Sequence, residues 1–82
     1  MSLKDWIFSG MIVETRNGIK YIVVGDIFYG LTEFIPIDEC YNDDLINNSF
    51  YEFDIMKIYD PKSGSLNDIL KENEDLDLRW KR

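Results

Sequence analysis

The chain has 82 residues, with 9 Lys and Arg against 16 Asp and Glu, and its formal net charge is -7. A chain of this length builds one small hydrophobic core, so we expect a single domain over residues 1–82. Histidine is absent and Cys40 is the only cysteine, which excludes disulfide frameworks, Cys/His zinc sites and nucleophile–histidine pairs. We therefore expect neither an enzyme nor a bound metal or other cofactor.

The lack of a long apolar segment bears on the location of the protein. The longest strictly apolar run is residues 21–24, far short of the ~20 residues that a membrane-spanning helix needs. Lys4 is followed directly by Asp5 and no apolar stretch comes next, so we expect no signal peptide. These features predict a cytoplasmic protein that does not enter a membrane.

The first predicted element is a short helical turn near the N-terminus. Ser2 and Asp5 have the spacing of a capping box, in which the first side chain accepts a hydrogen bond from the start of the helix. Leu3, Trp6 and Ile7 recur at helical intervals, which places them on one side of a helix. The pattern predicts a helical turn that packs on the core.

A β-hairpin is the clearest prediction for residues 11–26. Asn17-Gly18 separates two β-prone runs, residues 11–16 and 19–26. Asparagine and glycine both tolerate the positive φ angles of a type I′ turn, so the sequence predicts a tight hairpin at this point. Apolar residues alternate onto both faces of the second run, and we expect burial on both sides of its middle.

The centre of the chain predicts two more strands. We expect a turn around residues 27–29 and then a third strand over residues 31–37. Residues 38–50 are rich in Asn and Asp, which favour turns, and predict a polar connector. A fourth strand is expected over residues 51–60 because aromatic and β-branched residues dominate there.

The C-terminal part predicts a short helix at residues 65–73 and a fifth strand at residues 76–80, whose alternation places Leu78 and Trp80 inside. Five short strands, a tight hairpin and one or two short helices are typical of a mainly β fold. We expect a small SH3-like five-stranded antiparallel barrel. Its predicted core draws on Trp6, Val13, Tyr21, Val23, Phe34, Phe53, Ile55, Ile69, Leu78 and Trp80.

The negative charge is concentrated in one window, residues 38–54. This window holds six acidic residues and no lysine or arginine, so it accounts for nearly all of the net charge. It is either a solvated surface that keeps the protein soluble or a surface that binds a basic partner. Aromatic side chains often anchor protein interfaces. The predicted protein-binding residues are therefore Asp38, Glu39, Tyr41, Asp43, Asp44, Phe50, Tyr51, Glu52 and Asp54.

Several motifs carry a resemblance to a known group of proteins. They are WIFSGMIVETRNG at 6–18, YIVV at 21–24, YEFDIMKIY at 51–59 and LRW at 78–80. Together they resemble a family of short acidic proteins encoded by phages and prophages of Gram-positive bacteria. Small acidic phage proteins include inhibitors of host defence, among them anti-CRISPR proteins, so the resemblance implies a phage-derived inhibitor that acts in the host cytoplasm.

The leading functional hypothesis joins this resemblance to the acidic window. It is an acidic binding protein that inhibits a basic host protein, such as a CRISPR nuclease, through residues 38–54. Carboxylates spaced like phosphates can occupy a channel lined with Lys and Arg, which is the physical basis of DNA mimicry. An alternative is a structural or assembly module that forms a homodimer or a phage complex through a sheet edge. A second alternative is weak nucleic-acid binding through the basic residues 79–82, although the acidic face disfavours direct contact with phosphate.

Overall fold

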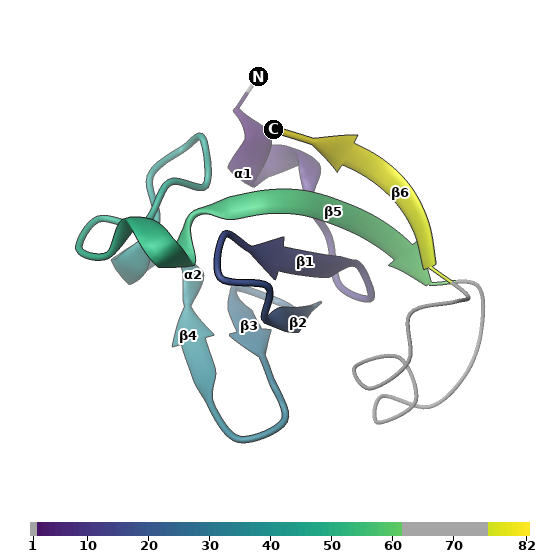
Figure 1. Cartoon of the computed structure of the whole chain (residues 1–82), viewed down its shortest axis with the longest axis horizontal. Helices are drawn as coiled ribbons and strands as arrows, with labels where there is room; N and C mark the ends of the chain where they lie inside the picture. Colours follow the sequence, from purple (N-terminus) through teal and green to yellow (C-terminus); the bar gives the residue numbers. More distant parts are fainter. Residues whose placement is uncertain (1, 62–75) are drawn as a thin grey trace.

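The structure, a computed structural model, describes residues 2–61 and 76–82. These residues form one antiparallel sheet of six strands with two short α-helices and a 3₁₀ turn (Figure 1). The strands follow the order β4-β3-β2-β1-β5-β6 across the sheet. The elements in chain order are α1 (Leu3–Trp6), β1 (Ile12–Thr15), β2 (Lys20–Val24), β3 (Ile27–Tyr29), β4 (Phe34–Pro36), α2 (Ile37–Cys40), η1 (Tyr51–Phe53), β5 (Ile55–Pro61) and β6 (Leu76–Lys81).

The predicted mainly β, antiparallel fold is confirmed, but its architecture differs from the expected five-stranded SH3-like barrel. Within the described residues the sheet has six strands and is open, because β4 and β6 are its two edges. The sheet curves strongly, and its two longest strands, β5 and β6, bend over one side of β1 (Figure 1). No helix in the described ranges has the length and apolar character to cross a bilayer.

The predicted N-terminal helix and hairpin are both present. Ser2 caps α1, and its hydroxyl accepts a hydrogen bond from the Asp5 amide at 3.3 Å. The hairpin joins β1 to β2, but its turn is not type I′. The carbonyl of Thr15 accepts a hydrogen bond from the Gly18 amide at 2.9 Å. Of the two turn residues Asn17 and Gly18, only Gly18 has a positive φ, +86°. The turn is therefore a three-residue loop closed by a glycine bulge, which is the next most common hairpin connection.

Residues 27–29 form the strand β3, where the sequence predicted a turn. The chain reverses before this point, because Val24 pairs with Ile27 and leaves a two-residue loop that begins with Gly25 at φ +62°. A glycine in this position is typical of the type II′ hairpin turn. The expected strand at 31–37 is shortened to β4, because the Gly30 amide donates to the Glu33 carbonyl and extends the preceding loop.

The fourth and fifth predicted strands also change at their ends. Residues 51–53 form the 3₁₀ turn η1, and β5 begins only at Ile55. In β6 a bulge interrupts the alternation, since Ile58 pairs with Trp80 while the adjacent Tyr59 pairs with Leu78. Leu78 and Trp80 therefore face opposite sides of the sheet, and Leu78 is exposed. The helix predicted at residues 65–73 lies outside the described residues.

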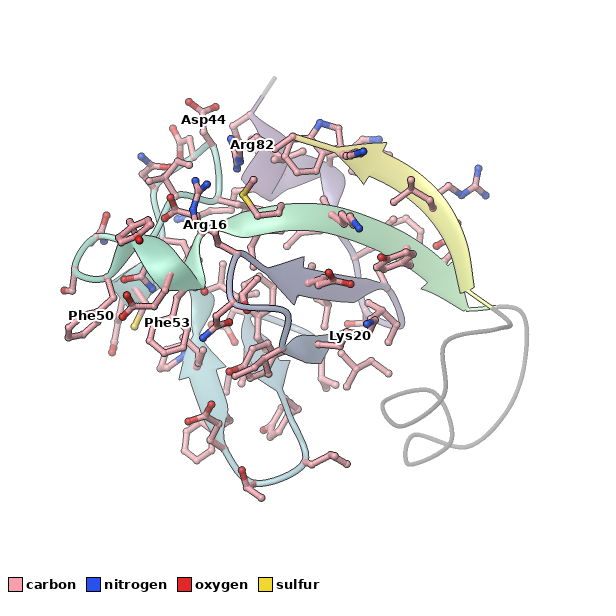
Figure 2. The ribbon with its side chains drawn as sticks, in the orientation of Figure 1. Arg16, Lys20, Asp44, Phe50, Phe53 and Arg82 are labelled. Carbon is pink, nitrogen blue, oxygen red and sulfur yellow. The ribbon has the colours of Figure 1, made fainter. Side chains whose placement is uncertain are left out.

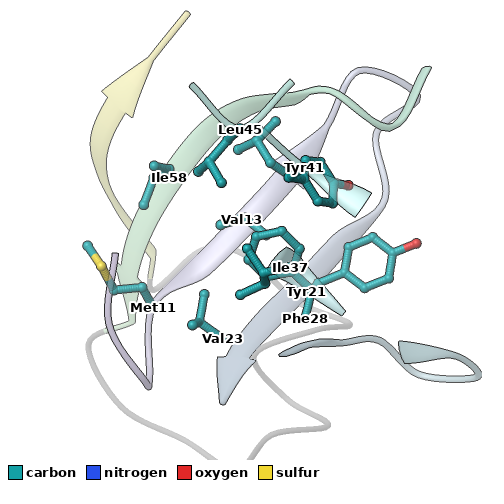
Figure 3. Packing of buried hydrophobic residues seen from close by; sticks show 10 residues of the cluster. Met11, Val13, Tyr21, Val23, Phe28, Ile37, Tyr41, Leu45 and Ile58 are labelled. Carbon is teal, nitrogen blue, oxygen red and sulfur yellow. The ribbon is translucent and has the colours of Figure 1, made fainter. Parts of the chain in front are cut away.

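The core fills the concave side of the sheet and is closed by α2 and the segment after it (Figure 3). Four of the predicted core residues, Val13, Tyr21, Val23 and Ile55, are fully buried, but Trp6 and Phe34 lie at the surface. Ile69 lies outside the described residues. Residues 38–50 are not a peripheral connector, because they supply two core side chains. The buried cluster is Met11, Val13, Tyr21, Val23, Phe28, Ile37, Tyr41, Leu45, Ile55 and Ile58.

The opposite face of the sheet carries a second apolar row. Strand register aligns one residue from each strand, so the row crosses the whole sheet. Ile12 at its centre is buried, whereas Phe34 and Leu78 at its two ends are exposed. This outer row consists of Phe34, Tyr29, Ile22, Ile12, Tyr59 and Leu78.

Candidate protein-binding site

The acidic window folds onto one side of the molecule, at the left of Figure 1. It comprises α2, the loop over residues 41–50 and the turn η1. We call the surface of residues 38–53 the acidic flank. Within it Asp38, Glu39, Asp43 and Asp44 are exposed and Glu52 is half-buried.

Asparagine side chains give the loop of the acidic flank its shape. The Asn42 Oδ1 atom accepts hydrogen bonds from the amides of Asp44 and Ile46, at 2.9 and 3.1 Å. The Asn47 Oδ1 atom accepts from the amides of Ser49 and Phe50, both at 2.9 Å. These are local side-chain turns of the kind that the Asn-rich sequence predicts. The loop is therefore a defined surface that presents its acidic side chains outward.

Tyr41 is a core residue and cannot contact a partner, in contrast to its predicted role as a binding anchor. Its side chain is 1 % exposed and its ring packs edge-on against Phe28, with centroids 5.3 Å apart. Its hydroxyl donates a hydrogen bond to the Phe53 carbonyl at 2.7 Å. Burial raises the pKa of Tyr41 to about 12. Tyr41 thus anchors the acidic flank to the sheet through its packing on Phe28.

Asp54 is likewise buried, and its predicted role in direct binding has to be corrected. Its carboxylate accepts from the Arg16 guanidinium at 3.2 Å and from the Asn47 amide at 2.9 Å. The exposed fraction of Asp54 is 4 %. Arg16 also donates from Nε to the Tyr51 carbonyl at 3.3 Å and lies 5.5 Å from the centre of the Tyr51 ring. Asp54 and Arg16 therefore join the end of the acidic flank to the first hairpin.

Two further cations hold the flank mainly through its backbone. Lys4 donates to the Tyr41 carbonyl at 2.8 Å and lies 3.5 Å from the Asp38 carboxylate. Arg82 donates to the Asp44 carbonyl at 2.7 Å, close to the Asp44 label in Figure 2. These two positive charges make the flank less negative than its sequence window alone implies. Among the described residues, however, no ion pair engages the carboxylates of Glu39, Asp43, Asp44 and Glu52.

Exposed aromatic side chains stand beside these carboxylates. Phe50 and Tyr51 are 57 % and 70 % exposed, as expected for residues that contact a partner. Phe53, which the sequence assigned to the core, is only half-buried and packs edge-on against Phe50, with centroids 6.1 Å apart (Figure 2). The acidic flank therefore combines unpaired carboxylates with an aromatic corner.

A cleft of about 240 Å³ opens next to this aromatic corner. It includes Glu33, which the sequence placed inside a strand and did not predict as a site residue. No local sequence signal marks Glu33 as a site residue, because the fold of β4 and α2 brings it next to the acidic flank. The lining residues are Glu33, Ile35, Glu39, Cys40, Asn47, Ser49, Phe50 and Phe53.

The basic C-terminal end is mostly engaged within the protein. Arg79 pairs with Asp60 at 2.6 Å. Arg82 donates from Nε to the Ile55 carbonyl at 2.9 Å and lies 4.9 Å from the centre of the Trp80 ring. Lys81 remains exposed. This end thus offers fewer available charges for a nucleic acid than its sequence suggests.

No group of three or more metal-ligating side chains occurs in the part of the chain that the structure describes.

Comparisons of the chain with protein-family models, with curated proteins and with solved structures found no match. The kinship with small acidic phage proteins therefore stays a prediction from the sequence motifs.

Proposed function

We propose that this protein is a non-enzymatic binding protein that recognises a basic surface of another protein through its acidic flank. The observation that carries the proposal is the placement, beside exposed Phe50 and Tyr51, of carboxylates that have no ion pair in the part of the chain that the structure describes. Aromatic anchors supply contact area, and the carboxylates accelerate encounter with a basic partner and select against acidic ones.

The partner proposed is a nucleic-acid-handling protein of a bacterial host, such as a CRISPR nuclease, and the binding is inhibitory. The charge of the flank supports the mode of binding, because proteins that hold nucleic acid line their channels with Lys and Arg. The sequence resemblance to phage proteins supports the class of partner. A protein that occupies such a channel competes with nucleic acid for the same cations.

Matched charge reversals test this proposal. Asp43→Lys changes an exposed acid of the flank, and Asp26→Lys changes an exposed acid in the turn between β2 and β3. We expect the tagged wild-type protein to capture a nucleic-acid-handling protein from a Gram-positive host lysate and to inhibit it after purification. Capture should weaken between about 0.1 M and about 1 M salt, as screening shortens the Debye length from about 10 Å to about 3 Å.

The two variants give the decisive comparison. Asp43→Lys should lose capture and inhibition, whereas Asp26→Lys should retain both, although each changes the net charge equally. Equal behaviour of the two variants would overturn the assignment of the flank. Capture that ignores salt would contradict a charge-based mode of recognition.

A second candidate function is self-association through the open sheet. The observation that favours it is the outer row, whose end residues Phe34 and Leu78 are exposed on the two edge strands, β4 and β6. Unpaired edges and exposed apolar side chains are common sites of association between copies. Light scattering should then show a dimer that Phe34→Ser converts to a monomer, while a monomeric wild-type protein rejects this candidate.

A further inference from the structure

We infer that the cleft beside Phe50 and Phe53 receives an arginine side chain of the partner protein. This inference rests on the proposed function and identifies the pocket at which the basic partner is read. The cleft lies between the start of β4, the end of α2 and the turn η1. Apolar and aromatic side chains and two glutamates line it together, and a long cationic side chain matches both features.

The walls of the cleft are apolar and aromatic. Ile35 belongs to β4 and is half-buried, Phe53 belongs to η1 and Phe50 directly precedes it, and all three side chains line the cleft. A volume of about 240 Å³ is large enough for one extended side chain but small for an organic cofactor. An arginine can lay its methylene stem along such a wall and place its guanidinium against an aromatic ring.

Two carboxylates supply the charge. Glu33 and Glu39 both line the cleft, both are exposed, and neither has an ion pair among the described residues. A cation that enters the cleft is attracted by the negative charge of both side chains. A guanidinium has donors on several nitrogens in one plane, so it can serve two carboxylates more fully than the compact ammonium of lysine.

The cleft is also prepared for its occupant. The Tyr21 hydroxyl donates to Oε1 of Glu33 at 2.7 Å, which orients this carboxylate. The Asn47 side chain accepts from the amides of Ser49 and Phe50 and so fixes the opposite rim. Groups that are already ordered lose little conformational entropy on binding, which favours affinity.

Alkylation of Cys40 can test whether the cleft is occupied. This residue is the only cysteine of the chain, it lines the cleft, and it is half-buried. The rate at which iodoacetamide alkylates Cys40 therefore reports whether the cleft is occupied. The probe is a hexapeptide of arginine, and its matched control is the same peptide with citrulline, which keeps the shape and removes the charge.

The expected result is slower alkylation with the arginine peptide and an unchanged rate with the citrulline peptide. At a peptide concentration of about four times Kd, mass action predicts alkylation about fivefold slower, because only the unbound fraction reacts. The double variant Glu33→Gln/Glu39→Gln should abolish the protection. The control variant Asp5→Asn/Asp26→Asn, which removes two exposed acids outside both the cleft and the acidic flank, should keep the protection.

Calorimetric titration of the same peptide distinguishes binding in the cleft from binding elsewhere on the acidic flank. One outcome is that Glu33→Gln/Glu39→Gln still binds the peptide and that the peptide does not protect Cys40 of the wild type. This outcome would overturn the cleft as the arginine site and leave the acidic flank as the binding surface. No binding of the arginine peptide to the wild type would overturn both. A hexapeptide of lysine that protects Cys40 equally well would overturn the preference for arginine.

Discussion

Three polar contacts join parts of this protein that are far apart in the sequence. Asp54 meets Arg16, the Tyr41 hydroxyl meets the Phe53 carbonyl, and the Tyr21 hydroxyl meets Glu33. No buried side-chain polar atom in the described residues lacks a hydrogen-bond partner. Because an unsatisfied buried group is costly, the contacts of Asp54 and Tyr41 help to fix the acidic flank, and the contact of Tyr21 fixes the loop before β4.

The ion pair of Asp54 is expected to matter more for stability than the ion pair of Asp38. Asp54→Ala leaves the partly exposed Arg16 guanidinium and the Asn47 amide without their acceptor, and we expect a loss of about 1–3 kcal/mol in the free energy of unfolding. Asp38→Ala removes a carboxylate that is largely exposed, and its loss should stay below about 1 kcal/mol. Urea denaturation measures both, and equal losses would contradict the structural role of Asp54.

Tyr41 predicts a loss of stability at high pH. Its pKa is raised from 10.0 to about 12 by burial. The native state therefore keeps a proton that the unfolded state releases, so this contribution is fully present below pH 10 and disappears as the pH rises towards 12. Within that window one such group contributes a slope of about 1 kcal/mol per pH unit.

Tyr41→Phe should reduce this slope. The variant should lose about 1 kcal/mol at neutral pH, since the Phe53 carbonyl loses its donor. Its stability should then fall less steeply between pH 10 and pH 12 than that of the wild type. Tyr51→Phe, at an exposed ring, is the control and should follow the wild-type curve. If Tyr41→Phe and the wild type show the same slope in denaturation at these pH values, the buried hydroxyl is not its source.

At the scale of elements, the turn between β1 and β2 depends on one glycine. Gly18 adopts φ +86°, a backbone conformation that disfavours residues with a Cβ atom. Gly18→Ala should lower the free energy of unfolding by about 1 kcal/mol. Gly18→Asn should lose less, because asparagine visits the left-handed region more readily. Chemical denaturation that finds alanine as stable as glycine would contradict the bulged turn.

The sequence predicts elements well where a few neighbouring residues decide them. The cap at Ser2 and the hairpin around Gly18 are both confirmed, because each depends on contacts within a few residues. The type of the hairpin turn is not recovered, since Asn17 keeps a negative φ while the Thr15 hydroxyl bonds to the Ile19 carbonyl. Such side-chain competition is hard to weigh from sequence alone.

The rest of the fold depends on register and distant contacts. The bulge near Trp80 inverts the predicted orientation of Leu78, and nothing in the alternating sequence marks it. Tyr41 is buried because its ring packs against Phe28 of β3, a contact between distant parts of the sequence. The acidic flank was predictable as a dense run of charge, but the cleft was not, because Glu33 reaches it through a separate strand.

At the scale of the whole molecule, the outer face and the acidic flank differ in how far their charges are compensated. On the outer face Lys20 and Lys57 both approach Glu14, at 3.1 and 4.0 Å, and the Tyr59 hydroxyl donates to the same carboxylate. Charges there largely compensate one another. On the acidic flank, Glu39, Asp43, Asp44 and Glu52 have no ion pair among the described residues, so the flank is the more negative of these two surfaces. This asymmetry is the basis of the proposed recognition of a basic protein.

The most direct measurement is a chemical-shift map of the ¹⁵N-labelled protein titrated with the arginine hexapeptide. The account predicts that the largest amide shifts cluster at Glu39, Asp43, Phe50 and Tyr51, and that the citrulline peptide produces none of them. Shifts centred on Phe34 and Leu78, or spread evenly over the acids of the molecule, would contradict the claim that the acidic flank is the binding surface.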